Sequence, residues 1–240
     1  MSDKSIVKLS GLCVLLSMAA EIAAIAVSAS HGLSPARANA MNWGVGEQLV
    51  FFQAGWFRLL FTLAIVAPCL SMLAWLAMYP VLAPGGAAAL FGVIVTSFGF
   101  LLGVIAEMIR FSVAMTLPVR YVAAPEAARP AILALGGFLS QLFHVLAMTS
   151  FILVYAVGMP FVVSAILRGR VLPRWLGWLL VIPSVLVGDV GAPLLLFRHP
   201  VGGPFVGLGL NIFFMWFLVL GILLLRWQPA ADQVRDVSRI

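Results

Sequence analysis

The sequence predicts an all-α, polytopic transmembrane helix bundle with about six spans and both termini in the cytoplasm. Of the 240 residues, 63% are hydrophobic and only 9% are charged, and the mean hydropathy is +1.14. Soluble domains carry roughly 25% charged residues, so this composition excludes a soluble domain of useful size. Apolar stretches of about 20 residues, which cross a ~30 Å hydrocarbon core as a helix, recur along the whole chain.

We expect a single transmembrane domain over residues 1–240. Its six spans are predicted near residues 7–29, 58–80, 88–110, 140–166, 175–197 and 206–226. Helix breakers or charges separate several of them, at residues 83–86 (APGG), 168–174 (RGRVLPR) and 198–204 (RHPVGGP). Between the third and fourth spans, we expect Pro118, Pro125 and Pro130 to prevent a continuous helix and to form a bent outer connection over 118–131.

The distribution of Lys and Arg sets the expected orientation. With the N-terminus inside, the cytoplasmic face carries Lys4, Lys8, Arg168, Arg170, Arg174, Arg226, Arg235 and Arg239. The outer connections carry Arg37, Arg120, Arg129 and Arg198. This excess favours cytoplasmic termini. The net charge of +6 is then a topology feature that favours contact with anionic membrane lipid, and no basic, aromatic-rich domain points to nucleic acid.

The first span has an alternative interpretation. Lys4 and Lys8, an apolar core over residues 9–20 and the small residues VSAS at 27–30 imitate a cleavable signal peptide. Glu21 would fit poorly in the apolar region of such a signal, and a retained first helix gives the better charge asymmetry. We therefore expect the first span to be retained.

An aromatic segment lies between the first two spans. Residues 30–57 contain MNWGVGEQLVFFQAGWF, in which Trp43, Phe51, Phe52, Trp56 and Phe57 could lie along the membrane surface as an interfacial helix. The segment is either an aromatic belt or a lid over the bundle.

Two opposite charges lie one helical turn apart in the third span. Glu107 and Arg110 share a helix face at spacing i, i+3 and can pair with each other. At a rise of 1.5 Å per residue, Glu107 lies about 28 Å from Ala88, near the outer boundary of the membrane. On its own, this pair is explained by a helix end that stabilises itself.

Polar residues in other spans suggest more. Glu21, Asp189 and Asn211 lie about 18, 21 and 22 Å from the inner ends of their spans, so they converge on one level. An outer tier is predicted from Arg58, Glu107, Arg110, Gln141 and His144. Because ionisable groups at such depth are costly in lipid, they normally face the bundle interior and find partners.

The predicted result is an outward-facing polar pocket. Its ligand-binding residues are Glu21, Arg58, Glu107, Arg110, His144, Asp189 and Asn211. The alternative is that these charges only fix the register of the helices, although desolvated ion pairs are poor stabilisers.

Other chemistry has little support in the sequence. No HxxxH, ExxH or CxxC spacing is present, so we expect neither a metal nor another cofactor, and Cys13 and Cys69 are interpreted as packing residues. No GxSxG elbow is present. Catalytic residues are therefore unknown, and the one enzymatic hypothesis is proton delivery from Glu21 or Asp189 to an apolar, isoprenoid-like substrate.

Two features concern the packing and shape of helices, and a third is a family resemblance. Gly99 and Gly103 form a GxxxG that permits close approach of another helix, and Pro183 is expected to disturb the fifth span close to Asp189. The stretches 58–82 (RLLFTLAIVAPCLSMLAWLAMYPVL) and 165–180 (AILRGRVLPRWLGWLL) resemble the DUF4386 family of uncharacterised bacterial integral membrane proteins. The resemblance covers about half the chain and implies a multi-pass protein of this size in the bacterial inner membrane, with no known reaction.

Three function classes remain open. The first is binding or transport of a small amphiphile, a lipid or a proton in the polar pocket. The second is a non-catalytic membrane subunit or scaffold with a membrane protein partner. The third, an acid-catalysed enzyme, comes last, and the chain is more readily interpreted as a non-enzyme.

Overall fold

A computed structural model describes residues 3–31 and 55–227, and helices connected by short turns make up this part of the chain. The helical elements are α1 (Asp3–Ser30), α4 (Trp56–Leu82), η1 (Ala83–Gly85), α5 (Ala87–Ala123), η2 (Glu126–Ala128), α6 (Arg129–Phe151), η3 (Ile152–Gly158), α7 (Met159–Gly169), α8 (Arg174–Pro183), η4 (Ser184–Gly191), α9 (Ala192–Leu196) and α10 (Gly202–Arg226).

Within the described residues, six continuous helices are long and apolar enough to cross a membrane. They cover Asp3–Ser30, Trp56–Gly85, Ala87–Ala123, Glu126–Gly169, Arg174–Leu196 and Gly202–Arg226. The prediction of an all-α bundle with six spans is confirmed, and the chain is a multi-pass membrane protein.

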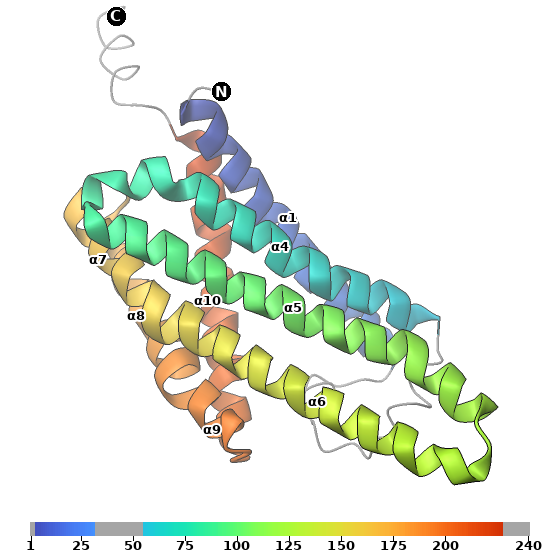
Figure 1. Ribbon diagram of the computed structural model, residues 1–240. Helices are drawn as coiled ribbons and strands as arrows, with labels where there is room; N and C mark the ends of the chain where they lie inside the picture. Colours follow the sequence, from blue (N-terminus) through green and yellow to red (C-terminus); the bar gives the residue numbers. More distant parts are fainter. Residues whose placement is uncertain (1–2, 32–54, 228–240) are drawn as a thin grey trace, which may run out of the picture.

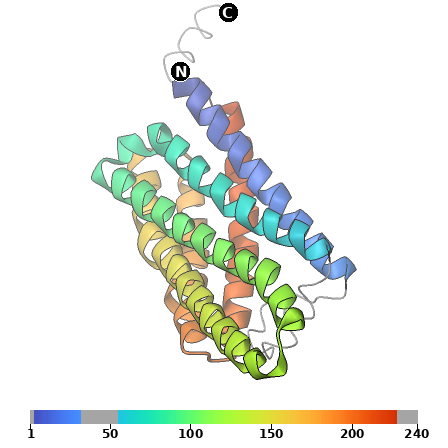
Figure 2. The same cartoon turned by 45° about the vertical axis from the view of Figure 1, so that its right-hand side comes forward.

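The spans form one bundle (Figures 1 and 2). In Figure 1, α4, α5 and α6 run side by side in front, and α10 passes behind them. The first turn of α1 and the last turn of α10 lie at the same end of the bundle, as an even number of spans requires. We call this the inner end and the opposite end the outer end. Which end faces the cytoplasm stays a prediction.

The third helix is longer than predicted. The sequence predicts an end near residue 110 and a bent connection from residue 118, but α5 continues through Pro118 to Ala123. An internal proline removes one hydrogen bond, and here Pro118 and its neighbour Leu117 are buried, so packing offsets that loss. The expectation for Pro118 was wrong.

The break comes at the second proline. Ala124, which precedes Pro125, adopts an extended conformation with ψ 141°, as expected for a residue before proline. Pro130 lies in the first turn of α6, where its missing N–H has no helical partner to lose. The fourth helix therefore begins at residue 126 instead of 140.

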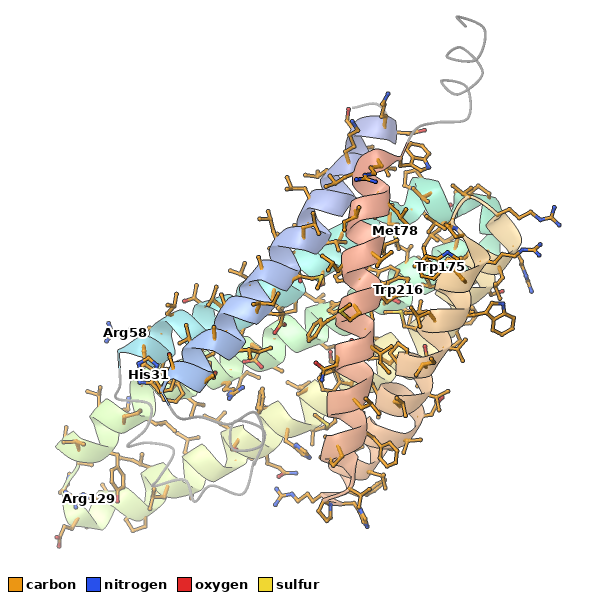
Figure 3. All side chains as sticks on the ribbon, turned by 180° about the vertical axis from the view of Figure 1, so that it is seen from behind. His31, Arg58, Met78, Arg129, Trp175 and Trp216 are labelled. Carbon is orange, nitrogen blue, oxygen red and sulfur yellow. The ribbon has the colours of Figure 1, made fainter. Side chains whose placement is uncertain are left out.

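The inner half of the bundle is held together by buried polar and aromatic contacts. Ser10 Oγ donates a hydrogen bond to the Ala74 carbonyl at 2.7 Å, which joins α1 to α4. Trp75 and Trp216 stack with their ring centroids 6.1 Å apart, and Trp216 Nε1 donates to the Leu176 carbonyl at 2.7 Å. The two contacts of Trp216 connect α10 to α4 and to α8. Figure 3 shows Met78 and Trp216 in this part of the bundle.

The predicted GxxxG contact is confirmed. A Cβ atom on Gly99 would lie 2.6 Å from Val154 Cγ2, and one on Gly103 would lie 3.0 Å from Ser150 Oγ. Ser150 Oγ also donates to the Gly99 carbonyl at 2.8 Å. These glycines allow α5 to approach the fourth span with almost no space between the backbones.

The aromatic segment between the first two spans is described only in part. Trp43, Phe51 and Phe52, and with them the predicted interfacial helix, lie outside the described residues. Trp56 and Phe57 form the first turn of α4. The Trp56 ring stacks on His31, with the centroids 4.3 Å apart, which joins the outer ends of α1 and α4. Figure 3 shows His31 beside Arg58 at this end.

Candidate functional site

Glu21 points into the bundle from α1. Val7 and Val14, which precede it at intervals of seven residues, are 0% and 1% exposed. Residues seven apart lie almost above one another on a helix, so Glu21 continues this inward stripe. Its side chain is half-buried.

Glu107 and Arg110 form an ion pair on the inward face of α5. Arg110 Nη1 lies 3.6 Å from Glu107 Oε1, and the two side chains are 28% and 20% exposed, respectively. The second carboxylate oxygen, Glu107 Oε2, is buried and has no hydrogen-bond partner in the part of the chain that the structure describes. Glu107 Oε1 is thus paired with Arg110, and Glu107 Oε2 could accept a hydrogen bond from a ligand.

Two aromatic rings hold the Arg110 guanidinium. Its central carbon lies 5.0 Å from the centroid of the Phe61 ring on α4 and 5.2 Å from that of the Phe143 ring on α6. Both distances are typical of cation–π contacts. The guanidinium is therefore fixed by three helices, with its charge beside Glu107.

Glu21 lies at the same level of the bundle as Arg110. Ser17 Oγ donates to the Ala67 carbonyl at 2.9 Å, which sets the register of α1 against α4. Glu21 lies about 6 Å beyond Ser17 toward the outer end, and Phe61 lies about 9 Å beyond Ala67. Because Phe61 contacts Arg110, Glu21 and Arg110 lie within a few ångströms of one level.

A buried phenol lies on the inner side of these charges. Tyr155 of η3 is in the same span as Ser150, which bonds to the Gly99 carbonyl about two turns inward of Glu107. We call Glu21, Glu107, Arg110 and Tyr155 the polar cluster. Its members come from three different spans.

Tyr155 was missed by the sequence analysis. It is 3% exposed, and its ring packs edge-on against Phe213 of α10, with centroids 5.2 Å apart. A phenol within an apolar span gives little signal by itself. A clearer signal lies in the repeated spacing V-x-x-V-G-x-P, at Val154–Pro160 and Val187–Pro193.

Two residues of the predicted outer tier join other helices. His144 is 5% exposed, and its Nε2 lies 3.0 Å from the Leu195 carbonyl of α9. Gln141 Oε1 accepts a hydrogen bond from the guanidinium of Arg198. Both contacts connect α6 to the outer end of the fifth span. Arg58 is exposed in the first turn of α4.

Asp189 and Asn211 differ from the expectation. Both are exposed, and Asn211 Nδ2 donates to the Gly207 carbonyl of its own helix at 2.8 Å. These two side chains are not buried in the bundle interior, since a count of residues along a helix does not give the direction of a side chain, and their part in the predicted pocket stays a prediction. Of the other predicted pocket residues, His144 is buried against α9, and Glu21, Glu107 and Arg110 lie on inward helix faces.

The cluster contains no obvious metal site. Among the described residues, no group of three or more His, Cys, Asp or Glu side chains is arranged to hold a metal ion. Cys13 is buried and Cys69 is half-buried, and both are free thiols. The chemistry of the cluster is therefore that of carboxylates, a guanidinium and a phenol.

No protein-family model, curated protein or solved structure matches the chain. The class of the protein, a multi-pass helical membrane protein, comes from its six apolar helices.

Proposed function

We propose that the polar cluster binds a positively charged group, either a proton or the cationic head of a small amphiphile. The observation that carries this proposal is the excess of carboxylates. Glu21 and Glu107 lie at the level of Arg110, the guanidinium that pairs with Glu107, whereas Arg58 is exposed at the end of α4. Glu107 Oε2 is buried without a partner in the described residues.

The charge balance of the cluster favours a cation. With all three groups ionised, two negative charges face one positive charge, which leaves one negative charge in an apolar bundle. An uncompensated charge is expensive in such surroundings. A bound proton or cation neutralises it, whereas an anionic lipid head would enlarge the imbalance.

Aromatic side chains near the polar cluster could contact the apolar part of an amphiphilic ligand. Phe61 and Phe143 flank Arg110, and the ring of Phe213 lies against Tyr155. A small amphiphile that placed its head at the carboxylates would therefore meet aromatic surface next to it. Binding sites of this kind combine an apolar lining with a few placed polar groups.

The setting of this function is part of the same proposal. Eight Lys and Arg residues expected on the inner side against four expected on the outer side support cytoplasmic termini, and the resemblance to DUF4386 supports a bacterial inner membrane. With that orientation the cluster serves ligands or protons that arrive from the outside, and transport would follow if the ligand also left toward the inside. Membership of the DUF4386 family is proposed on the stretches 58–82 and 165–180.

A second function, as a subunit of a membrane complex, has one observation in its favour. Asp189 is exposed within a helix that is apolar enough to cross a membrane. A carboxylate facing lipid costs about 2.5–3.5 kcal/mol on insertion scales. A partner helix with a hydrogen-bond donor at this depth would remove that cost.

Native mass spectrometry of the detergent-purified protein tests the amphiphile. We expect a co-purifying cationic molecule on the wild type and on Asp189→Asn, and none on Glu21→Gln or Glu107→Gln. Loss from Asp189→Asn alone would contradict the proposed site and point to the exposed face of η4.

Infrared spectroscopy tests the proton. A protonated carboxyl group gives a C=O stretch that is separate from the carboxylate bands. We expect the wild type to show this band and either Glu→Gln variant to lose it. Absence of both the band and a bound cation from the wild type would refute the proposed function.

A further inference from the structure

Two π-helical segments interrupt neighbouring spans at equivalent positions of a repeated sequence. The repeat is Val154–Pro160 (VYAVGMP) in the fourth span and Val187–Pro193 (VGDVGAP) in the fifth. The π segments η3 and η4 end within these repeats, at Gly158 and Gly191. In both repeats the π segment ends at a glycine, and a proline follows two residues later, at Pro160 and at Pro193.

The prolines explain why both breaks come at the same place. In η3 the Met159 N–H bonds to the Val154 carbonyl, and in η4 the Ala192 N–H bonds to the Val187 carbonyl, five residues back in each case. The next donor in each segment would be Pro160 or Pro193, and proline has no N–H. Each π segment therefore leaves one carbonyl without its helical donor.

The two segments cross with their backbones in contact. A Cβ atom on Gly188 of η4 would lie 2.3 Å from the Ala156 nitrogen and 2.7 Å from the Tyr155 carbonyl carbon of η3. Only glycine permits this approach. No side chain of residue 188 stands between the two segments at this point.

The helices on either side of the crossing are tied in pairs. On the outer side, the His144 contact with the Leu195 carbonyl and the bond between Gln141 and Arg198 join α6 to the fifth span. We call α6 and α9 the outer clamp. On the inner side, the Gly177 position of α8 lies against Ile166 and Leu167 of the fourth span, and we call α7 and α8 the inner clamp.

The outer clamp carries part of the cover of the polar cluster. Phe143 of α6 lies 5.2 Å from the Arg110 guanidinium, whereas Glu107 and Arg110 belong to α5. The bond from Ser150 to the Gly99 carbonyl joins α6 to α5 close to the crossing, and Phe143 lies about two turns farther out. A rotation of the outer clamp about the crossing would therefore move Phe143 relative to the cluster.

We propose that the crossing of η3 and η4 is a pivot about which the outer clamp swings, so that Phe143 covers and uncovers the polar cluster. π segments are common where helices bend and at functional sites. Interrupted helices at corresponding positions of two segments are a recurring feature of membrane transporters, in which one bundle of helices rocks against another. The swing itself does not require that the cluster bind a ligand.

Electron-spin distance measurements between pairs of labels test the pivot in the full-length protein. After replacement of Cys13 and Cys69, labels at the exposed positions Leu135 of α6 and Leu59 of α4 report on the outer clamp. Labels at Trp175 of α8 and Leu12 of α1, which are also exposed, report on the inner clamp. We expect a broad or two-peaked distribution for the outer pair and a narrow one for the inner pair.

The prolines supply the decisive variants. Pro160→Ala with Pro193→Ala restores both missing donors, so we expect the outer distribution to narrow to about half its width. Each single variant should narrow it in part, which keeps the test valid if the double variant folds poorly. Pro118→Ala is the matched control, because Pro118 lies inside the continuous helix α5, and should change nothing.

An outer distribution of equal width in the wild type and in the variants at Pro160 and Pro193 would overturn the pivot. Narrowing by Pro118→Ala to the same extent would overturn it as well. If the outer clamp moves but Glu21→Gln changes neither bound mass nor carboxyl band, the pivot stands and the proposed ligand site fails.

Discussion

Glu107 is bound to Arg110 through only one of its two oxygens. Oε1 lies 3.6 Å from Arg110 Nη1, and Oε2 is buried with no partner among the described residues. A helix end that merely stabilised itself would satisfy both oxygens or expose them to water. The half-paired carboxylate, with Glu21 at the same level, is the reason to treat this pair as part of a site.

Exchange of the two charges should not restore the protein. In Glu107→Arg with Arg110→Glu, the new carboxylate would lie against the faces of Phe61 and Phe143, whose negative charge density attracts cations. We expect the double variant to remain less stable than the wild type by about 1–2 kcal/mol, the size of two cation–π contacts. Thermal unfolding in detergent measures this, and full restoration would show that the pair acts only on itself.

The crossing at Gly188 should be intolerant of a methyl group. In Gly188→Ala the new Cβ would lie 2.3 Å from the Ala156 nitrogen, and relief of that overlap should cost about 3 kcal/mol. Gly207→Ala is the control, since no atom lies within 4 Å of the position of its Cβ. The control should be neutral or more stable by about 0.5–1 kcal/mol. Equal unfolding temperatures for the two variants would contradict the close crossing.

The contact between α1 and α4 should depend on Ser17. Its Oγ donates to the Ala67 carbonyl and lies 2.8 Å from Ser71 Oγ. Interhelical hydrogen bonds in membrane proteins contribute about 0.6 kcal/mol on average and up to about 1.7 kcal/mol, so Ser17→Ala should lower stability within that range. Thr116→Ala is a suitable control, because among the described residues its hydroxyl bonds to the Ser112 carbonyl of its own helix. A larger loss in the control would contradict this assignment.

The number of spans was predictable and their ends were not. Six apolar stretches of sufficient length are visible in the composition, since lipid demands nearly continuous hydrophobic helices. The end of α5 was misplaced because Pro118 was treated as a helix breaker, whereas burial of Pro118 and Leu117 keeps the helix intact. Packing of this kind is not visible in a single sequence.

The levels and directions of the candidate site residues were predictable only in part. The sequence predicts Glu21 on a deeper level than Glu107 and Arg110, whereas the contacts of Ser17 and Phe61 place Glu21 within a few ångströms of the level of Arg110. Glu21 follows Val7 and Val14 at heptad spacing, so its inward direction could have been read from α1. Asp189 lies in η4, where bonds to the fifth residue back change the angle between successive side chains. The direction of the Asp189 side chain therefore cannot be predicted from its position in the sequence by assuming a regular α-helix. For Tyr155, the repeated V-x-x-V-G-x-P spacing was the usable signal.

The most direct test of the central claim compares two amphiphiles of opposite charge. Decylammonium and decanoate have chains of matched length, and each is added to the purified protein while the thermal unfolding midpoint is recorded. A ligand that binds only the folded state stabilises it by about 2.7 kcal/mol at 100 times its Kd. We expect decylammonium to raise the midpoint of the wild type and of Asp189→Asn by several degrees, and to have no effect on Glu21→Gln or Glu107→Gln. An equal or larger rise with decanoate, or a rise that persists in both Glu→Gln variants, would contradict a cation site at Glu21 and Glu107.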